Sequence, residues 1–312
     1  MDIQENILLA PYTVYKIGGP ARYFAEASNA DELLIALQFA KANDIQFFIL
    51  GAGSNVLISD KGFSGLVIHL VSGGIEVKVD EVIVDAGVLL ARLVATALAK
   101  GLSGIEWAIG IPGSLGGSIR GNAGCFGGEM KDVVETIRVY DTKRGEEFVL
   151  PGNAAEFGYR DSIFKRHPEW VILSATVKLF PGDTARSQAL IREYATKRTA
   201  AQAIGSKSCG CIFKNIPWGR KGISKEKILM RFPGMPPSGT VDGIPVSYLI
   251  SEAGLKGRRI GDIEVSQRHA NYFVNHGNGT ADEVAMLIAL VKEYVHRTFG
   301  LVIEEEIQYV GF

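Results

Sequence analysis

The stretch "GIPGSLGGSIRGNAG", Gly110 to Gly124, places six glycines among Ser114, Ser118 and Asn122. Glycine has no Cβ, so the backbone amides of such a loop approach an anion without steric obstruction. Arg120 adds a positive charge to the same loop. An ordinary connection does not need this density of glycine, and we therefore predict a phosphate-binding loop.

A second glycine loop, "LGAGSNVLISD", follows a short apolar strand predicted over residues 45–50. Gly51 and Gly53 match the start of a dinucleotide fingerprint, but Val56 replaces its third glycine and the following residues look extended. A Rossmann fingerprint needs a helix N-terminus to hold the pyrophosphate, so that fold is excluded. The loop is either a structural turn or, with the first loop, one side of a diphosphate site.

The composition of the chain excludes several classes of protein and of partner. The 312 residues hold 33 basic and 34 acidic side chains, a balance that does not indicate a general nucleic-acid or membrane partner. The chain is long for one core, so we expect two or three domains. Three cysteines are too few for a disulfide framework, and no apolar run is long enough to span a membrane. The start, "MDIQENILLA", does not resemble a secretory signal, and we expect a soluble cytoplasmic protein.

Periodicity predicts an α+β or α/β first half, over residues 10 to 185. The helix predicted over 31–44 has Asn29 or Asp31 as its cap. Further helices are predicted over 89–101 and 187–202, and further strands over 65–70, 82–87, 135–141 and 170–180.

The second half opens after Gln202. A long helix is predicted over 280–300, where Thr280 and Glu283 form a capping box and Gly300 ends the helix. A short helix over 245–254 and strands over 271–275 and 301–311 complete this half.

The segment "GSKSCGCIFKN", 205–215, places Cys209 and Cys211 on either side of one glycine. Two thiols are too few for a structural zinc site, and no other cluster supplies ligands. A disulfide at this separation closes a strained ring, and a thioredoxin-like pair needs two residues between its sulfurs. The three interpretations that use both sulfurs therefore fail.

Several motifs stand in the order of one known family. They are "YKIGGPARYF", "LGAGSNVLISD", "GIPGSLGGSIRGNAG", "YRDSIFK", "GCIFKN", "SYLISEAGLKGRRIGDIEVSQRHANYFVN" and "EEEIQYVG". From about residue 12 to residue 311 the chain resembles the UDP-N-acetylenolpyruvoylglucosamine reductase (MurB) family. The short interval between "YRDS" and "GCIF" resembles the family's shorter type, which lacks a tyrosine-bearing substrate loop.

The resemblance implies an α+β fold. An FAD-binding domain of the vanillyl-alcohol-oxidase (PCMH) type would occupy residues 1–185, with two α+β subdomains at about 1–70 and 71–185. A C-terminal α+β substrate-binding domain would occupy residues 200–312, and its final strand would return Glu306 to the active site.

The implied reaction is a reduction in peptidoglycan precursor synthesis. NADPH reduces FAD, and the enolpyruvyl sugar nucleotide then takes a hydride from the flavin and a proton from the protein, which yields UDP-N-acetylmuramate. The resemblance implies no metal, nucleic-acid or membrane partner, and we expect a monomer. Two alternatives are a related FAD-dependent oxidase of another alcohol or sugar and a non-catalytic sugar-nucleotide-binding protein.

Three residues match the family's catalytic positions. Arg160 corresponds to the arginine that stabilises the enolate, although a surface salt bridge is the alternative. Cys211 stands where the family usually has the proton-donating serine, and an unperturbed thiol, with a pKa of about 8.5, is a better acid than an alcohol. Glu306 corresponds to the catalytic glutamate, with Glu305 in place of the usual proline, and we expect Glu306 to share a pocket with Arg160. On a strand, Glu304 and Glu306 would face one way and Glu305 the other, and without the family motif this trio resembles a solvated edge.

The resemblance also implies binding residues. Lys214 and Asn215 correspond to contacts with the substrate diphosphate and Tyr159 precedes the catalytic arginine, while His269 is either a substrate contact or a satisfied core histidine. The FAD-binding candidates are Ile17, Gly18, Gly51, Gly53, Ser54, Asn55, Gly113, Ser114, Gly117 and Asn122.

One segment exceeds the family pattern. Residues 218–237, "WGRKGISKEKILMRFPGMPP", which we name the insert, carry five basic side chains against one glutamate. The insert is either a mobile basic surface loop or a segment that folds over the sugar-nucleotide diphosphate.

Overall fold

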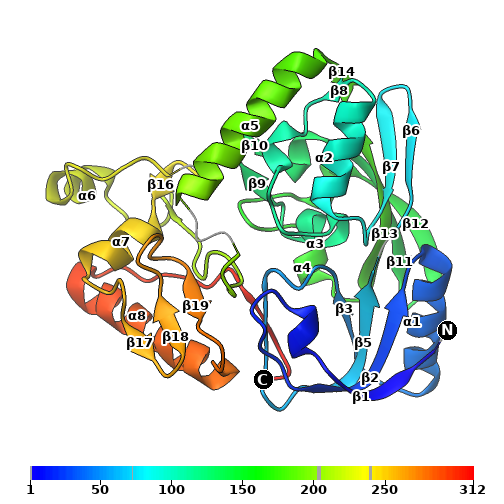
Figure 1. Cartoon of the computed structure of the whole chain (residues 1–312), viewed down its shortest axis with the longest axis horizontal. Coiled ribbons are helices and arrows are strands. Elements are labelled where there is room, and N and C mark those ends of the chain that lie inside the picture. Colours follow the sequence, from blue (N-terminus) through cyan, green and yellow to red (C-terminus); the bar gives the residue numbers. More distant parts are fainter. Residues whose placement is uncertain (1, 72, 202–204, 239–240) are drawn as a thin grey trace. The chain divides into compact units, whose positions relative to one another are not determined.

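The computed structural model describes residues 2–71, 73–201, 205–238 and 241–312. The chain divides into two compact units. The first comprises Met1–Leu8, Pro20–Gly53 and Gly62–Ala200, and the second comprises Leu9–Gly19, Ser54–Lys61 and Ala201–Phe312. Two short early segments therefore fold with the C-terminal residues (Figure 1). The domain boundaries at residues 185 and 200 stay predictions.

A four-stranded sheet in the first unit has the order β1-β2-β5-β3. β1 runs antiparallel to β2, whereas β2, β5 and β3 are parallel. The strands are β1 (Gln4–Leu8), β2 (Pro20–Ala27), β3 (Phe47–Leu50) and β5 (Phe63–Leu70). The predicted first helix is α1 (Ala30–Ala42), and its cap is Asn29, whose side chain accepts a hydrogen bond from the Glu32 N–H.

A five-stranded antiparallel sheet in the same unit has the order β12-β11-β13-β7-β6. Its strands are β6 (Ile75–Lys78), β7 (Glu81–Asp85), β11 (Val134–Asp141), β12 (Glu146–Pro151) and β13 (Trp170–Lys178). Leu33 and Leu37 of α1 share one core with Ile68 of the first sheet and Leu173 of the second. α1 therefore joins the two sheets of this unit into one body.

The remaining elements of the first unit complete a second core on the five-stranded sheet. The helices are α2 (Leu90–Ala99), α3 (Leu115–Arg120), α4 (Ile163–Arg166) and α5 (Thr184–Ala201), with short 3-10 helices at Glu106–Ala108, Met130–Asp132 and Gly152–Ala155. The two-stranded sheets pair β8 (Leu102–Ser103) with β14 (Phe180–Pro181) and β9 (Gly124–Cys125) with β10 (Gly128–Glu129). The helix predicted to end at Gln202 is described as far as Ala201, and Gln202 lies outside the described residues.

The second unit is built on α8 (Ala281–Phe299), which lies against the antiparallel sheet β17-β18-β19 (Figure 1). Its capping box, Thr280 with Glu283, and the left-handed Gly300 at φ +72° confirm the predicted start and end of this helix. The remaining elements are a 3-10 helix at Ala10–Tyr12, β4 (Val56–Ile58), β15 (Ile216–Pro217), α6 (Lys225–Arg231), β16 (Gly243–Ile244), α7 (Val246–Glu252), β17 (Arg259–Ile260), β18 (Ile263–Val265), β19 (Phe273–Asn275) and β20 (Gln308–Val310).

The prediction of a strand over 301–311 was too long. Only Gln308–Val310 forms a strand, β20, which pairs in parallel with β4. The three glutamates precede this strand, and their backbone pairs instead with residues 212–214. Glu304 is exposed and ion-paired with Arg220, and Glu305 is half-buried and ion-paired with Lys292. The segment changes partner along its length, which shortens the regular strand.

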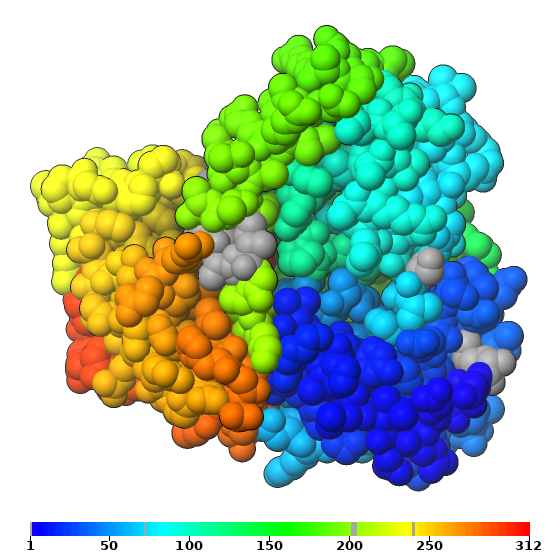
Figure 2. Space-filling model, in the orientation of Figure 1, coloured from blue at the N-terminus to red at the C-terminus, as the bar shows by residue number. Residues whose placement is uncertain are grey.

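The insert contains a helix, α6, and one buried side chain, Phe232, so it is not a loop throughout. Ser224 caps α6 by accepting a hydrogen bond from the Lys227 N–H. Phe232 is buried in the core of the second unit, with Trp218, Ile228 and other apolar residues of the insert packed around that core. Figure 2 shows the insert, in yellow, continuous with the surface of the second unit.

No helix in the described part of the chain is long and apolar enough to cross a membrane. Within the described ranges, no three His, Cys, Asp or Glu side chains are grouped as metal ligands.

Candidate functional site

A tight turn in the first unit presents Tyr159 and Arg160. Gly158 and Asp161 exchange backbone hydrogen bonds of 3.0 and 3.2 Å, which leaves these two residues at the tip. Arg160 has a left-handed backbone, with φ +54°, a conformation that costs a non-glycine residue about 1–3 kcal/mol. Its Nη2 donates to the Gly124 carbonyl at 3.2 Å, and its own carbonyl accepts from Lys165 Nζ at 2.5 Å. The surrounding bonds therefore hold an arginine in a conformation that it would not adopt alone.

Asn122 connects this turn to the glycine loop. Its buried Nδ2 donates to Glu129 at 2.6 Å and to the Gly158 carbonyl at 2.9 Å, while its Oδ1 accepts from the Lys131 N–H at 3.0 Å. The side chain of this FAD-binding candidate thus holds the loop against the turn that carries Arg160. The glycine loop and the arginine form one structural element of the first unit.

The two glycine loops approach each other within the first unit. A Cβ placed on Gly51 would lie 2.2 Å from Ser114 Oγ, so a larger residue there would require Ser114 to move. Gly53 has φ +61°, a left-handed conformation that glycine adopts without strain. Ser114 is buried and directly precedes α3, next to Gly113, and Gly117 lies in the first turn of that helix. The loops predicted to share a diphosphate are therefore neighbours.

The backbone of residues 51–54, in the loop "LGAGSNVLISD", has N–H groups that could bind an anion. In the described chain, the N–H groups of residues 51–54 donate to no protein acceptor. Gly53 is buried, and a buried N–H without an acceptor carries a cost that a bound anion removes. Successive N–H groups of this kind fit the phosphates of a dinucleotide.

A ribbon of paired backbone in the second unit carries Cys211 and Glu306. The Glu306 N–H donates to the Ile212 carbonyl at 2.7 Å, and the Lys214 N–H donates to the Glu304 carbonyl at 2.8 Å. Cys211 is bridged to Tyr272 on its other side. Glu306 therefore lies opposite the residue that follows Cys211, and the structure brings these two predicted residues together.

Asn271 clamps this ribbon. Its buried side chain accepts from the Phe213 N–H at 2.9 Å and donates to the Phe213 carbonyl at 2.8 Å, while its own carbonyl accepts from the Ile212 N–H. A side-chain amide offers a donor and an acceptor side by side, as these two bonds require. The conformation two residues after Cys211 is thus set by a residue that the sequence did not single out.

The two cysteines differ in environment. Cys209 is 3 % exposed, and burial, reinforced by the charges of Cys211 and Glu306, raises the pKa of its thiol. Cys211 is half-buried, and neither cysteine forms a disulfide. Cys209 is thus enclosed and held protonated, whereas Cys211 retains access to a ligand.

Four FAD-binding candidates lie in the second unit: Ile17, Gly18, Ser54 and Asn55. Asn55, next to Ser54, donates from Nδ2 to the Glu306 carbonyl at 3.3 Å, and its own carbonyl accepts from the Gln308 N–H. Ile17 is a core residue, and Gly18, with φ +145°, approaches Ile58 closely. Asn55 therefore holds the segment that carries the predicted catalytic glutamate.

The two predicted substrate-binding residues Asn215 and His269 differ in their hydrogen bonds. Asn215 Oδ1 accepts from the Val246 N–H at the start of α7, and its Nδ2 donates to Ser238 at 2.8 Å. His269 packs edge-on against Tyr272, and its buried Nδ1 finds no partner among the described residues. Burial, reinforced by Lys256, lowers the pKa of His269. His269 therefore has an enclosed ring nitrogen without a hydrogen-bond partner among the described residues, and its role as a substrate contact stays a prediction.

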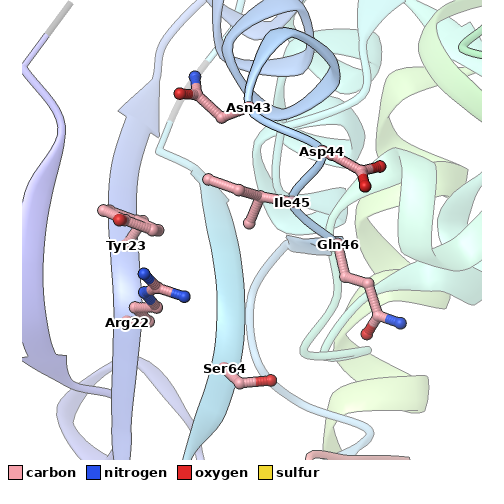
Figure 3. Close-up of a pocket in the computed structure, with 7 residues that line it drawn as sticks. All are labelled: Arg22, Tyr23, Asn43, Asp44, Ile45, Gln46 and Ser64. Atoms are coloured by element: carbon pink, nitrogen blue, oxygen red, sulfur yellow. The ribbon is translucent and has the colours of Figure 1, made fainter.

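A shallow pocket of about 370 Å³ lies elsewhere in the first unit (Figure 3). It lies where β2 and β5 begin, whereas Gly51 follows the end of β3, which runs parallel to them. Its lining consists of Arg22, Tyr23, Asn43, Asp44, Ile45, Gln46 and Ser64. None of these residues belongs to the predicted site.

Comparison with known proteins identifies the family. A model described as the C-terminal domain of UDP-N-acetylenolpyruvoylglucosamine reductase matches residues 202–310, and one described as an FAD-binding domain matches residues 21–150. The reductase of a Synechococcus strain is 36% identical over 99% of this chain and 91% of its own length. This chain belongs to the UDP-N-acetylenolpyruvoylglucosamine reductase family. The Carboxydothermus hydrogenoformans member is also 36% identical, over 99% of this chain and 94% of its own.

A solved member of the family has the same fold. The crystal structure of the Thermus caldophilus reductase superimposes with a TM-score of 0.77 at 30% identity and covers 99% of each chain. The predicted α+β fold, with an FAD-binding domain followed by the C-terminal domain of this family, is confirmed. The unpaired amides of residues 51–54 fit the cofactor that the family model names, whereas most amides of the Gly110–Gly124 loop donate to backbone carbonyls of the protein.

The predicted catalytic residues are distributed over both units. Arg160 belongs to the first unit, and Cys211 and Glu306 belong to the second. Each is held by hydrogen bonds within its own unit, and the pocket expected to contain both Arg160 and Glu306 stays a prediction. Sequence reasoning missed Asn271, because a buried clamp leaves no periodic or motif signal.

Proposed function

We propose that this protein is an NADPH-dependent flavoenzyme, an oxidoreductase that reduces the enolpyruvyl group of UDP-N-acetylenolpyruvoylglucosamine to give UDP-N-acetylmuramate. The observation that carries this proposal is the similarity to the reductases over the whole chain, which spans both domains. When bound, FAD would supply the hydride that it takes from NADPH. We expect the enzyme to act as a cytoplasmic monomer in peptidoglycan precursor synthesis.

The protein's own part in the reaction is to stabilise negative charge and to deliver a proton. As hydride adds to one alkene carbon, the electron pair moves toward the substrate carboxylate. The Arg160 guanidinium would bind this carboxylate as two parallel hydrogen bonds, and its left-handed backbone supports such a preset orientation. Cys211 would donate its S–H proton to the other alkene carbon and become a thiolate that solvent reprotonates. Glu306 would orient the substrate beside Cys211.

The contacts of the two glycine loops and of the ribbon support roles for the binding residues. Unpaired amides support a role for Gly51, Gly53 and Ser54 at the FAD diphosphate, and the close approach of Gly51 to Ser114 supports a role for Gly113, Ser114 and Gly117. Asn122, Asn55, Ile17 and Gly18 would act mainly by holding these segments in place. For the substrate we propose Tyr159, Lys214, Asn215 and His269.

The test separates the two half-reactions. Wild-type enzyme should bleach its flavin with NADPH and recover the flavin absorbance on anaerobic addition of the enolpyruvyl sugar nucleotide. Cys211→Ala should retain flavin reduction but lose the recovery, whereas Cys211→Ser should retain part of it. The matched control is Cys209→Ala, which removes the enclosed thiol and should leave both half-reactions intact.

Two outcomes would contradict the proposal. If the wild-type protein binds no flavin, it is not a flavoenzyme. If its reduced flavin is not reoxidised by the enolpyruvyl sugar nucleotide, the result favours the alternative of an oxidase with another substrate. Undiminished recovery in Cys211→Ala would remove Cys211 from the role of acid and leave the overall reaction standing.

A further inference from the structure

The insert is anchored on α7 and on the end of α8. The Phe232 ring meets Tyr248 edge-on at 5.8 Å and Phe299 edge-on at 5.4 Å. Arg231 donates from Nη2 to the Thr298 carbonyl at 2.7 Å and lies over the ring of Phe299. A lid for a diphosphate needs its cations directed at the ligand, whereas this cation is directed at the protein.

Arg220 continues the same line of contacts beyond the end of α8. Its Nη1 donates to the Val302 carbonyl at 2.9 Å, and its Nη2 is 3.0 Å from Glu304 Oε1. The planar guanidinium thus binds a backbone oxygen and a carboxylate two residues apart, which a single ammonium group does not reproduce. Through this residue the insert holds the chain from Val302 to Glu304.

The segment held by Arg220 leads directly to Glu306. The Glu304 carbonyl accepts from the Lys214 N–H, and the Glu306 N–H donates to the Ile212 carbonyl. These two bonds set the register between the segment that carries Glu306 and the segment that carries Cys211. A shift of Val302 and Glu304 would therefore move Glu306 relative to Cys211.

We propose that Arg220 is a positioning residue for the reduction, which keeps Glu306 in register with the segment that carries Cys211. The proposal rests on the roles proposed above for Glu306 and Cys211. The pair with Glu304 is largely exposed, with side chains 33% and 58% accessible, so it contributes little to stability. Its effect is geometric, because displacing a catalytic group by about 1 Å can lower the rate of reaction about 100-fold.

The insert itself offers matched controls. The side chains of Lys221 and Lys227 make no hydrogen bond or ion pair with the described residues, yet each carries the same charge as Arg220. Arg220→Met removes the two contacts and one charge, whereas Lys221→Met and Lys227→Met remove one charge and no contact. The comparison separates positioning from attraction of the anionic substrate.

Three measurements test the proposal on the full-length holoenzyme. Arg220→Met should slow flavin reoxidation by the enolpyruvyl sugar nucleotide by about 10- to 100-fold, lowering kcat more than it raises KM. It should leave flavin reduction by NADPH and the melting temperature unchanged. Hydrogen exchange of the peptide that contains Glu306 should accelerate, because the N–H donated to Ile212 opens more often. Both lysine variants should behave as wild type, and Arg220→Lys should be intermediate.

A double variant completes the design. If the two side chains act as a unit, adding Glu304→Gln to Arg220→Met should cause no further loss. Equal increases in KM for Arg220→Met, Lys221→Met and Lys227→Met, with kcat unchanged, would show that Arg220 acts by attracting the anionic substrate and would overturn the proposal. A loss of both half-reactions, or a lower melting temperature for Arg220→Met alone, would show a general structural role and also overturn it. If the wild type fails to reoxidise its flavin with the substrate, the proposed function itself is wrong.

Discussion

Replacing Asn271 with Asp changes one functional group at the clamp on Phe213. The amide donates to the Phe213 carbonyl and accepts from its N–H, at 2.8 and 2.9 Å. The introduced carboxylate keeps the acceptor but places a second negatively charged oxygen against a carbonyl, in a site where the side chain is 2% exposed. Only the protonated carboxylic acid can make both bonds, because it alone has a donor.

The structure sets the size and the sign of the effect. Burial without a compensating donor raises the pKa of a carboxyl by about 3–5 units in a fully buried site, from about 3.9 in the unfolded chain. A rise of about three units corresponds to about 4 kcal/mol, at 1.36 kcal/mol for each unit. Since the folded pKa is raised, the stabilising contribution is fully present below about pH 4 and is lost as the pH rises toward about 7.

Urea denaturation at pH 4 and pH 7, followed by circular dichroism, measures this difference. The Asn271→Asp variant should lose about 4 kcal/mol relative to wild type at pH 7 and about 1 kcal/mol or less at pH 4. Asn278→Asp, at an exposed asparagine of the same unit, is the matched control and should change stability by less than about 0.5 kcal/mol at either pH. Equal destabilisation of Asn271→Asp at both pH values would refute the argument, since no protonated form would then restore the clamp.

Three further outcomes are expected. Gly51→Ala should weaken FAD binding at least about tenfold, because its Cβ would displace the Ser114 side chain, which we propose lies at the FAD diphosphate; fluorescence titration of the apoprotein measures the loss. Because burial lowers the pKa of His269, wild type should lose stability as the pH falls below about 6.5, and His269→Gln should flatten this dependence in thermal melts across pH 5 to 8. Thr280→Ala should cost about 1 kcal/mol of unfolding free energy, because Glu283 loses its capping partner, and an undiminished melting temperature would contradict this.

Local signals predicted the elements whose stability is local. α8 was recognisable because its capping box, its apolar spacing and its terminal glycine all lie within one stretch of sequence. The strand after residue 300 was predicted too long, because alternation of side chains does not reveal which backbone serves as the partner. The insert resembled a loop in sequence because charged residues dominate its composition. Its packing depends on Phe232, whose ring contacts Tyr248 and Phe299 far away in the sequence.

The sequence by itself determined the family, the two glycine loops and the positions of Arg160, Cys211 and Glu306, since these depend on residue type and spacing along the chain. The hydrogen bonds that hold these residues became visible only in the folded chain. Asn122 ties the glycine loop to the turn of Arg160, and Asn271 and Arg220 support the ribbon that carries Cys211 and Glu306. The reason is physical: a hydrogen bond between residues far apart in the chain depends on where folding brings them, and neither residue type nor periodicity records that distance.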